Sequence, residues 1–490
     1  MALASGRRGM VRRTRREGST MRRRSAAWRV FVLATGTACG LAGAARGETI
    51  EVPRDQATIQ AAVDASGPGD VIVVKAGTYR ESVVVSGCSH RYVQIYSDGQ
   101  VVIEGRGVAP AITVRSAKGI GIHGFTVHSG GDGVSITKSG DVTVDGLTAT
   151  DCPGTGIRVD ASADVTLQWN VVSGAGGSGV AITATHYVTV NANVFSDIGA
   201  DGLTVTGGTD VYLCGNDVTD CGGSGVSCTG VGQLVIDETH IDGIVGDAIT
   251  VSHSGEVAIL SNDLGDHDPA TTIGGDAVHV ESSAHVTVEV NAITDVAGAG
   301  VSVTGPGATI QSNTILDVGG TGVQVGGTAT TYVGQNVIER PRGSGVVVDG
   351  ESNSVESNRI TFAGFDGVAV HGGDNYVASN IVYRSANDGV CVTNAAGDAG
   401  VVVRDNLVTR PGGDGLDLGA TCESRITGNT VSRAHGNGIA MTTGAGNVLD
   451  ANQATRSRGF DLFEGSDPVS NEVGPTNRFR KMNKRHRHRK

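Results

Sequence analysis

Two groups of acidic and imidazole side chains in this sequence are candidates for chemistry. The first group consists of Asp247, Asp266, His267, Asp268, Asp276, His279 and Glu281. Carboxylate oxygens are the ligands that Ca²⁺ prefers, and a histidine that titrates near neutral pH serves as a general acid or base. We therefore expect a cation site for Ca²⁺ or a transition metal, with the ligands Asp247, Asp276 and Glu281. The residues expected to be catalytic are Asp266, His267, Asp268 and His279.

The second group consists of three aspartates that each precede a glycine, Asp366, Asp388 and Asp414, and of the nearby Asp417. Two carboxyl groups that flank a glycosidic bond can hydrolyse it, and their separation decides whether the sugar configuration is retained or inverted. A structural alternative exists for both groups. An aspartate before a glycine is a preferred turn residue, and the first group is also consistent with a solvated acidic loop.

Both groups are embedded in a long repeat. A glycine followed by an aliphatic residue returns in steps of 23 residues (156 − 133, 179 − 156, 202 − 179, 225 − 202), at Gly133, Gly156, Gly179, Gly202 and Gly225. Ala248 and Ala277 take its place in the next two copies, and the glycine then recurs from Gly300 to Gly459. The largest steps are 29 residues (277 − 248) and 26 residues (415 − 389), and each contains part of one candidate group.

Apolar and polar residues alternate within each copy, as in Val134-Ser135-Ile136, which indicates strands. Strands this short, separated by Gly, Ser and Asp turns, leave no room for the crossover helices of an α/β fold. Three short strands per copy predict a coil that pairs in parallel with the coils before and after it. The predicted fold is therefore all-β, a single-stranded right-handed parallel β-helix of about 16 coils. Neighbouring coils would bring Asp247 close to Asp276, because paired strands lie about 4.8 Å apart.

A second column of residues supports this repeat. Nine residues before the marker glycine (179 − 170) an asparagine recurs, at Asn170, Asn193, Asn216, Asn262, Asn291, Asn313, Asn336, Asn358, Asn380, Asn406, Asn429 and Asn452, once local insertions are allowed for. Asparagine tolerates the left-handed conformation of a tight bend, and stacked amides can form hydrogen bonds along the axis. We interpret this column as a structural ladder.

The N-terminus is typical of a cleaved signal peptide, which we assign to residues 1–46. Ten arginines and one acid in residues 1–29 precede a short apolar run, and small residues follow at Ala42, Gly43 and Ala44. The protein is therefore predicted to be secreted or periplasmic. No other segment has the length of a transmembrane helix.

Removal of residues 1–46 would leave 27 basic and 49 acidic side chains (38 − 11 and 50 − 1), a net charge of −22. Such a surface repels nucleic acid and attracts cations. Residues 476–490 form a basic tail that we expect to be disordered and to bind an anionic envelope polymer or lipid head groups. Export permits disulfides, and the equal spacing of three cysteines favours a Cys214–Cys221 or a Cys221–Cys228 bridge.

The Asp-Gly-Val/Ile and Asn-x-Val/Ile repeats of residues 110–475 resemble the parallel β-helix repeats of NosD-type carbohydrate-binding and sugar-hydrolase proteins. Residues 58–64 and 71–81 are similar to the start of pectinesterases and other pectin-lyase-like proteins. This resemblance implies a capping helix over the open end of the solenoid, within a region of cap and first coils at 47–109. The catalytic segments of pectinesterases have no counterpart in this sequence, which excludes that activity.

Other proteins similar in predicted fold suggest where a site would lie. Mannuronan C5-epimerases and alginate lyases use Asp and His clusters on such a wall, although Asp266-His267-Asp268-Pro269 has the residues of the epimerase signature in another order. Polygalacturonases use stacked aspartate pairs. We therefore expect a protein that binds or modifies a polysaccharide, as a lyase, epimerase or hydrolase. The alternative is a non-catalytic structural or metal-handling protein of the NosD type, and the sequence leaves open whether the chain is an enzyme.

Overall fold

The computed structural model describes residues 47–265, 272–394, 400–465 and 471–483. The chain divides into two units, Met1–Ala45 and Arg46–Lys490, and the first of them lies outside the described residues. The prediction of a signal peptide at residues 1–46 therefore remains a prediction. The second unit is a stack of short parallel strands arranged in three columns, with one strand of each column in a typical coil.

The first column begins the stack and pairs each strand with its equivalent one coil away. Its strands are β1 Thr49–Val52, β2 Val71–Tyr79, β4 Gln94–Glu104, β6 Lys118–His123, β9 Gly140–Asp145, β12 Ala163–Gln168, β15 His186–Asn191, β18 Thr209–Cys214, β21 Gln233–Asp237, β24 Glu256–Leu260, β27 Val286–Glu289, β30 Thr309–Gln311, β33 Tyr332–Gly334, β36 Ser354–Glu356, β39 Tyr376–Ala378, β42 Val402–Arg404, β45 Arg425–Thr427, β48 Val448–Asp450 and β51 Glu472–Val473.

The second column branches from the first at the long strand β4, which pairs with β6 through Gln94–Tyr96 and with β7 through Val102–Glu104. Its further strands are β7 Thr126–His128, β10 Thr148–Thr150, β13 Val171–Ser173, β16 Val194–Ile198, β19 Asp217–Cys221, β22 His240–Ile244, β25 Asp263–Leu264, β28 Ala292–Thr294, β31 Thr314–Leu316, β34 Val337–Glu339, β37 Arg359–Thr361, β40 Ile381–Tyr383, β43 Leu407–Thr409, β46 Thr430–Ser432 and β49 Gln453–Thr455.

The third column forms a separate sheet and carries the candidate residues. Its strands are β3 Val83–Ser86, β5 Ile112–Arg115, β8 Val134–Thr137, β11 Ile157–Asp160, β14 Val180–Thr183, β17 Leu203–Thr206, β20 Val226–Thr229, β23 Ile249–Ser252, β26 Val278–Glu281, β29 Val301–Thr304, β32 Val323–Ala329, β35 Val346–Glu351, β38 Val368–His371, β41 Val390–Thr393, β44 Leu416–Ala420, β47 Ile439–Met441 and β50 Leu462–Glu464.

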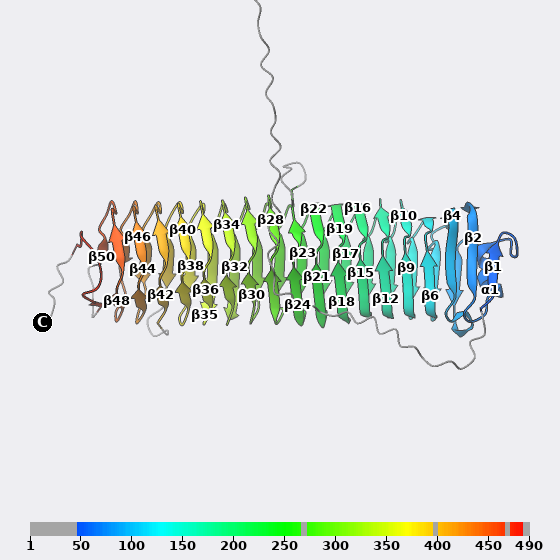
Figure 1. Cartoon of the computed structure of the whole chain (residues 1–490), viewed down its shortest axis with the longest axis horizontal. Coiled ribbons are helices and arrows are strands. Elements are labelled where there is room, and N and C mark those ends of the chain that lie inside the picture. Colours follow the sequence, from blue (N-terminus) through cyan, green and yellow to red (C-terminus); the bar gives the residue numbers. More distant parts are fainter. Residues whose placement is uncertain (1–46, 266–271, 395–399, 466–470, 484–490) are drawn as a thin grey trace, which may run out of the picture. The chain divides into compact units, whose positions relative to one another are not determined.

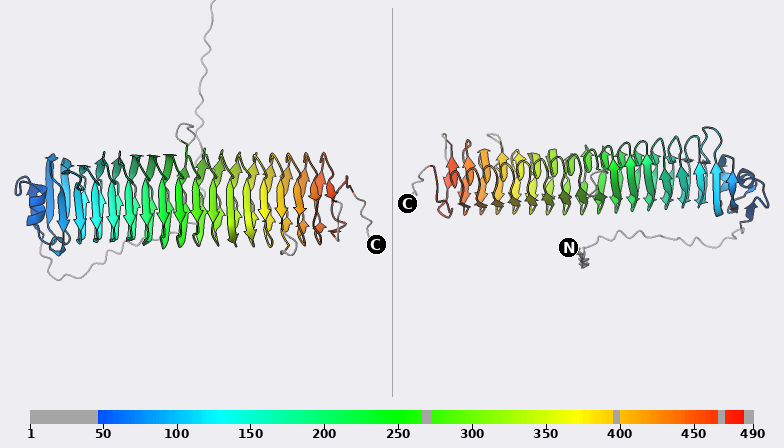
Figure 2. Two further views of the ribbon diagram at one scale, coloured as in Figure 1. Left: turned by 180° about the vertical axis from the view of Figure 1, so that it is seen from behind. Right: turned by 90° about the horizontal axis from the view of Figure 1, so that it is seen from above.

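The coils follow one another in sequence order from the helix α1, Ile59–Ala65, to β50 (Figure 1). The same order is seen from behind and from above in Figure 2. Within residues 130–460 the described parts of the chain contain strands and no helix, which confirms the predicted all-β solenoid. The predicted count of about 16 coils is slightly low, because the third column alone has 17 strands and α1 replaces that strand in the first coil.

The interior is filled by the inward residues of each strand. Val134 and Ile136 of β8 are fully buried, whereas Ser135 between them faces outward. The marker glycines are needed because each lies against the next coil. A Cβ at Gly389 would approach the carbonyl oxygen of Gly415 to 2.5 Å and a methyl group of Val408 to 2.2 Å. No side chain larger than hydrogen fits there without a shift of the backbone.

The predicted asparagine ladder is confirmed. Asn313 is fully buried, its backbone N–H and its side-chain amide both donate to Oδ1 of Asn336 at 3.0 Å, and the amide also donates to the Val288 carbonyl at 2.9 Å. One detail of the prediction is wrong. The left-handed residue of the bend is the one before the asparagine, as at Ser312 with φ 57°, because the asparagine itself must aim its amide into the turn.

The helix α1 closes the first coil and confirms the predicted cap. Thr58 caps its N-terminus by accepting the N–H of Ala61, and the Glu81 carboxylate accepts the N–H groups of Ile59 and Gln60. The first coil has no strand in the third column, and the Gln60 side chain forms the hydrogen bonds with Val84 that the backbone of such a strand would form. Its Oε1 accepts the N–H of Val84 at 2.7 Å and its Nε2 donates to the Val84 carbonyl at 3.2 Å.

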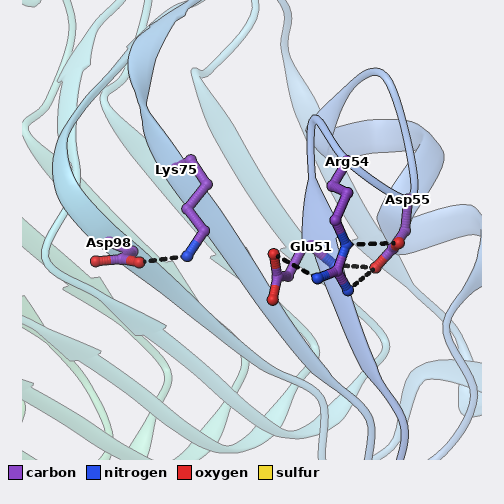
Figure 3. A network of polar contacts seen from close by, with 5 residues as sticks. All are labelled: Glu51, Arg54, Asp55, Lys75 and Asp98. Carbon is purple, nitrogen blue, oxygen red and sulfur yellow. Dashed lines mark hydrogen bonds and ion pairs between the residues drawn. The ribbon is translucent and has the colours of Figure 1, made fainter.

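Charged side chains lie on the outside of these first coils (Figure 3). Arg54 forms ion pairs with Glu51 and Asp55, and Lys75 forms one with Asp98 at 2.6 Å. The basic partners are largely exposed, so solvent screens these pairs and they contribute little to stability. A short 3₁₀ helix, Cys88–His90, follows β3 in the chain.

Two further predictions require correction. All seven cysteines after residue 46 are free, and neither expected disulfide is present, because Cys214, Cys221 and Cys228 lie on the first, second and third columns of the solenoid. The predicted tail begins later than residue 476. Arg480 and Lys481 donate backbone N–H groups to Asp461, and Asn483 contacts Glu464, so residues 476–483 pack on the last coil. Residues 484–490 lie outside the described residues.

Candidate functional site

The candidate site is built on the six-residue turns that join the second column to the third. The first residue of each turn is left-handed, the fifth usually carries a small polar or acidic side chain, and the sixth is usually the marker glycine or alanine. The exceptions are Ala299 at position five and, in the last turn, Phe460 and Asp461 at positions five and six, so that Asp461 and not Gly459 is equivalent to Gly438. Residues 384–389 and 410–415 are two consecutive turns of this kind. Position five therefore forms a column of side chains along one edge of the third sheet.

Wherever position five is an aspartate, its carboxylate connects one turn to the next. One carboxylate oxygen accepts the backbone N–H of position five in the next coil, as Asp201 does for Ser224 at 2.8 Å and Asp388 does for Asp414 at 2.6 Å. The second oxygen is left for another partner. Thr204 donates to it in Asp201, and Arg158 forms an ion pair with it in Asp132. A purely structural role in the turn thus accounts for the contacts of one carboxylate oxygen in each of these aspartates.

The first predicted group follows the same rule. Asp247 accepts the backbone N–H of Asp276 at 2.7 Å, which confirms that the two are neighbours, and its other oxygen accepts the Thr250 hydroxyl at 3.0 Å. Asp276 accepts the N–H of Ala299 and contacts Nδ1 of His279 at 3.2 Å.

The remaining members of that group do not complete a site among the described residues. Glu281 lies two residues beyond His279 on β26 and is exposed. Asp266, His267 and Asp268 lie outside the described residues. No three of the described members bring their ligand atoms within 4.8 Å of one another. A cation site here remains a prediction.

The second predicted group is brought together. Cys391 of β41 and Asp417 of β44 are directly paired in register, and Asp388 precedes β41 on the turn. The ligand atoms of Asp388, Cys391 and Asp417 lie within 4.8 Å of one another, the one such group among the described residues. A register shift follows this pair, between Cys391 and Thr393, and such irregularities are common beside active sites. Sequence reasoning had placed the aspartates here but had given Cys391 no role.

Burial and like charge make this carboxylate group unusual. Burial, with smaller contributions from Asp417, Asp366 and Asp414, raises the pKa of Asp388 to about 6, although the N–H of Asp414 opposes the rise. Burial also raises the pKa values of Asp366 and Asp417. Burial and the neighbouring carboxylates raise the pKa of the Cys391 thiol to about 12. The thiol is therefore protonated at neutral pH, and Asp388 exchanges its proton near pH 6.

The polar contacts of Asp388 indicate where that proton resides. Its Oδ1 accepts the Asp414 N–H at 2.6 Å, whereas Oδ2 is 3.3 Å from Nδ2 of Asn387, which makes its shorter bond to Asp366 at 2.7 Å. Oδ2 is the oxygen left for a proton. This arrangement can supply a proton from Asp388 and a second carboxylate from Asp417, or it can bind a divalent cation through both.

Comparison with known proteins gives two family matches. The family described as "Right handed beta helix region" matches residues 76–226, 110–264 and 321–473, which together cover more than half of the chain. The family described as "Periplasmic copper-binding protein (NosD)" matches residues 223–381. A comparison with curated proteins found no match. No helix among the described residues is long and apolar enough to cross a membrane.

Three solved structures are among those matched. The A-module of a mannuronan C-5 epimerase from Azotobacter vinelandii is 16% identical with a TM-score of 0.32, over 87% of this chain and 95% of that one. An alginate lyase from Paenibacillus sp. is 18% identical with a TM-score of 0.29, over 59% and 94%. A family 28 exopolygalacturonase from Yersinia enterocolitica is 9% identical with a TM-score of 0.32, over 89% and 79%. At these identities and TM-scores the similarities say nothing about activity.

Proposed function

Because the chain belongs to the family of right-handed β-helix proteins, we propose that its third sheet carries a glycosidase site, in which Asp388 and Asp417 hydrolyse a polysaccharide. One observation carries this proposal. Two carboxylates from adjacent coils approach within 4.8 Å, and one of them, Asp388, has a pKa of about 6. A general acid with a pKa near the working pH and a close second carboxylate are the two groups that glycoside hydrolysis requires.

The spacing selects the retaining form of the reaction. In retaining glycosidases the two carboxyl groups are about 5–5.5 Å apart, whereas inverting enzymes need a wider gap to admit a water molecule. Asp388 donates its proton to the glycosidic oxygen as the bond from that oxygen to the anomeric carbon breaks, and an Asp417 oxygen bonds to the anomeric carbon. Water then attacks this carbon, gives its proton to Asp388 and releases Asp417.

The experiment is a screen of the purified protein against uronans and neutral glycans, with new reducing ends as the measured product. Asp388→Asn and Asp417→Asn are expected to lower the rate by about 10²–10⁴-fold, the usual contribution of such groups. The matched control is Asp201→Asn, because Asp201 occupies the same turn position and makes the same backbone bond without a close second aspartate. Equal rates in all three variants, or no product from any glycan, would contradict the proposal.

Cation binding is a second candidate function of the same group. One observation favours it: the Cys391 sulfur lies beside the two carboxylates. The copper-binding family matches residues 223–381, which contain the first predicted group and not this one. A bound cation stabilises the native state, so Cu²⁺ or Ca²⁺ would raise the melting temperature of the wild type. Loss of this rise in the Asp388→Asn, Asp417→Asn variant would place the cation here. Its loss in an Asp247→Asn, Asp276→Asn variant would place it at the first predicted group instead.

The wider setting of this function is also a proposal. A site for polysaccharides on an exported protein matches the arginine-rich N-terminus, for which we propose secretion or transfer to the periplasm. The basic residues after 483 are proposed to bind an anionic envelope polymer.

A further inference from the structure

The first position of the six-residue turns reverses its charge along the solenoid. Each of these residues is left-handed, and those before the reversal are five aspartates and two glycines: Asp151, Gly174, Asp197, Asp220, Gly243, Asp295 and Asp317. The reversal comes at Arg340, and the later turns have Phe362, Arg384, Arg410, Arg433 and Arg456, with φ between 53° and 60°. A column that is otherwise equivalent thus turns from acidic to basic in the part of the chain that holds Asp388 and Asp417.

The arginines at position one of the turns beyond the reversal form no ion pairs within the described residues, whereas Arg404 of the first column is paired with Asp405. Arg340 at the boundary is neutralised, because it forms two hydrogen bonds of 2.7 Å with Asp317. Beyond it, Cζ of Arg384 lies 5.6 Å from the Phe362 ring centre and 5.3 Å from that of Tyr383, and Arg410 donates to the Tyr383 hydroxyl at 3.4 Å. We call Arg384, Arg410, Arg433 and Arg456, with Phe362 and Tyr383, the arginine ladder.

The members of the arginine ladder stand on consecutive coils. The backbone N–H of Arg384 donates to Thr409, the residue before Arg410, and the N–H of Arg410 donates to Ser432, the residue before Arg433. Consecutive arginines are therefore attached to the backbone at about the strand spacing of 4.8 Å. That repeat is comparable to the length of one pyranose ring in a linear polysaccharide. It is longer than the 3.4 Å rise between phosphates of one strand of B-form DNA.

The residue types point to carboxylates and sugar rings. All ten basic residues between 340 and 460 are arginines and none is lysine, and the planar guanidinium matches a carboxylate with two parallel hydrogen bonds. Phe362 is 42% exposed and stands on a left-handed residue, with Tyr383 edge-on to its ring and Arg384 over it. An exposed aromatic face beside arginines can stack on the apolar face of a sugar ring.

We propose that the arginine ladder binds a linear polysaccharide with one acidic group per sugar, lying parallel to the solenoid axis with about one sugar per coil. This inference rests on the proposed function, because it names the substrate class of the Asp388–Asp417 pair. The two surfaces are adjacent: Arg384 and Asp388 are positions one and five of one turn, and Arg410 and Asp414 are those of the next. A chain held by the ladder runs beside the carboxylates that would cleave it.

The test measures binding of polygalacturonate, with its fully methyl-esterified form as an uncharged polymer of the same backbone. Binding is measured in the Asp388→Asn, Asp417→Asn background, so that turnover does not consume the ligand and loss of catalysis cannot be mistaken for loss of binding. We expect polygalacturonate to bind, with an affinity that falls as salt rises, and the ester to bind at least about tenfold more weakly.

Two double variants with the same change in net charge provide the matched comparison. Arg410→Ala, Arg433→Ala removes two steps of the ladder, and Arg404→Ala, Arg425→Ala removes two exposed arginines of the first column. The former is expected to weaken binding of polygalacturonate at least about tenfold, the loss of two charge-assisted contacts, and the latter less than about twofold. Circular dichroism checks that both remain folded.

Several results would overturn the inference. They are equal weakening in the two double variants, equal affinity for the ester, or binding of single-stranded DNA in place of the polyuronate. Dimerisation through the ladder, seen by sedimentation and lost in Arg410→Ala, Arg433→Ala without any binding of polygalacturonate, would assign it to a second copy of the chain. Binding that follows the predicted pattern without any turnover supports the ladder and contradicts only the proposed hydrolysis.

Discussion

Asp388 and Asp201 occupy the same position of equivalent turns, and each accepts a backbone N–H from the next coil. Their surroundings differ. A threonine hydroxyl contacts the second oxygen of Asp201, whereas Asp388 faces Asp417 and the thiol of Cys391. The same residue in the same turn is therefore a structural acceptor in one coil and a candidate general acid in another. Two other side chains decide the chemistry of this aspartate: the one three residues later in the chain, and the one that pairs with that residue in the next coil.

The raised pKa of Asp388 has a definite consequence for stability. Its value of about 6 in the folded chain exceeds the ordinary aspartate value of about 3.9, so the native state binds more protons than the unfolded state between these values. The stability that this group contributes is complete below about pH 4 and is lost as the pH rises through about 6. Asp388→Asn is expected to reduce this loss between pH 4 and 7, as measured by denaturant unfolding.

The pKa itself can be measured from the ¹³C shifts of the aspartate carboxyl groups. We expect the signal that Asp388→Asn removes to have a midpoint near pH 6, and Asp417→Asn to lower that midpoint, because it removes a neighbouring negative charge. Asp201→Asn should remove a different signal and leave this midpoint unchanged. A midpoint near 4 for Asp388 would show that the carboxylate is solvated and ordinary.

Part of this site could be predicted from single residues. The Asp-Gly repeat located Asp366, Asp388 and Asp414 in one column, and the period placed Asp417 nearby. Cys391 was missed because a lone cysteine in a strand gives no signal until its partner in the next coil is known. The cation site expected at Asp247 and Asp276 stays a prediction. Each of these aspartates, like Asp388, has one oxygen bound by a backbone N–H, which the sequence does not reveal.

Among the elements, the turns are held together by ladders of buried side chains. The asparagine ladder was visible in the sequence because a single residue type repeats. A second ladder was missed, in which Ser139, Ser162 and Thr185 begin a series that Asn353, Asn375 and Asn447 continue. Its members change between serine, threonine and asparagine, since each of these can accept the backbone N–H of the preceding coil.

The contribution of a ladder residue can be measured at Asn313. Replacement by leucine removes an amide that donates to Val288 and Asn336 and leaves buried backbone groups without a partner, which costs about 1–3 kcal/mol. Chemical unfolding of Asn313→Leu measures this loss. The control is Gln335→Leu, an exposed residue of the same bend one coil later, for which we expect little change. Equal stability of the wild type and Asn313→Leu would contradict the ladder.

The left-handed turn residues show what a pattern search overlooks. Most lie five residues before a marker glycine, as Asp317 before Gly322 (322 − 317) and Arg410 before Gly415 (415 − 410), whereas Arg456 lies five residues before Asp461 (461 − 456). The column is regular in position but reverses in charge, so a search for one repeated residue type does not find it. No Lys or Arg occurs from 159 to 339, and five of the ten arginines between 340 and 460 share this turn position.

For the whole molecule, the fold followed from the period. Parallel coils must place equivalent residues above one another, so a repeat of about 23 residues with strand alternation determines the solenoid, its columns and its interior. The ends are less regular and were predicted less completely. The α1 cap was expected, but its replacement of a strand through Gln60 was not, and residues 476–483 pack on the last coil because Asp461 binds two of their backbone N–H groups.

In the proposed function, the parallel coils hold two carboxylates at the spacing of neighbouring strands, and a column of arginines lies beside them. The spacing of the two carboxylates also predicts the stereochemistry of hydrolysis, which a binding experiment does not measure. Carboxylates this close leave no room for a water molecule between acid and nucleophile, so the sugar must form an ester with Asp417 first and its configuration must be retained.

The most direct measurement is therefore the anomeric configuration of the first product, followed by ¹H NMR before mutarotation, on the glycan that the screen identifies. The account predicts a product with the same anomeric configuration as the substrate, formed by the wild type and by Asp201→Asn but not by Asp388→Asn. An inverted product would mean that two more distant carboxylates act. An unsaturated sugar end would mean elimination in place of hydrolysis, and either result would contradict the assignment of Asp388 and Asp417.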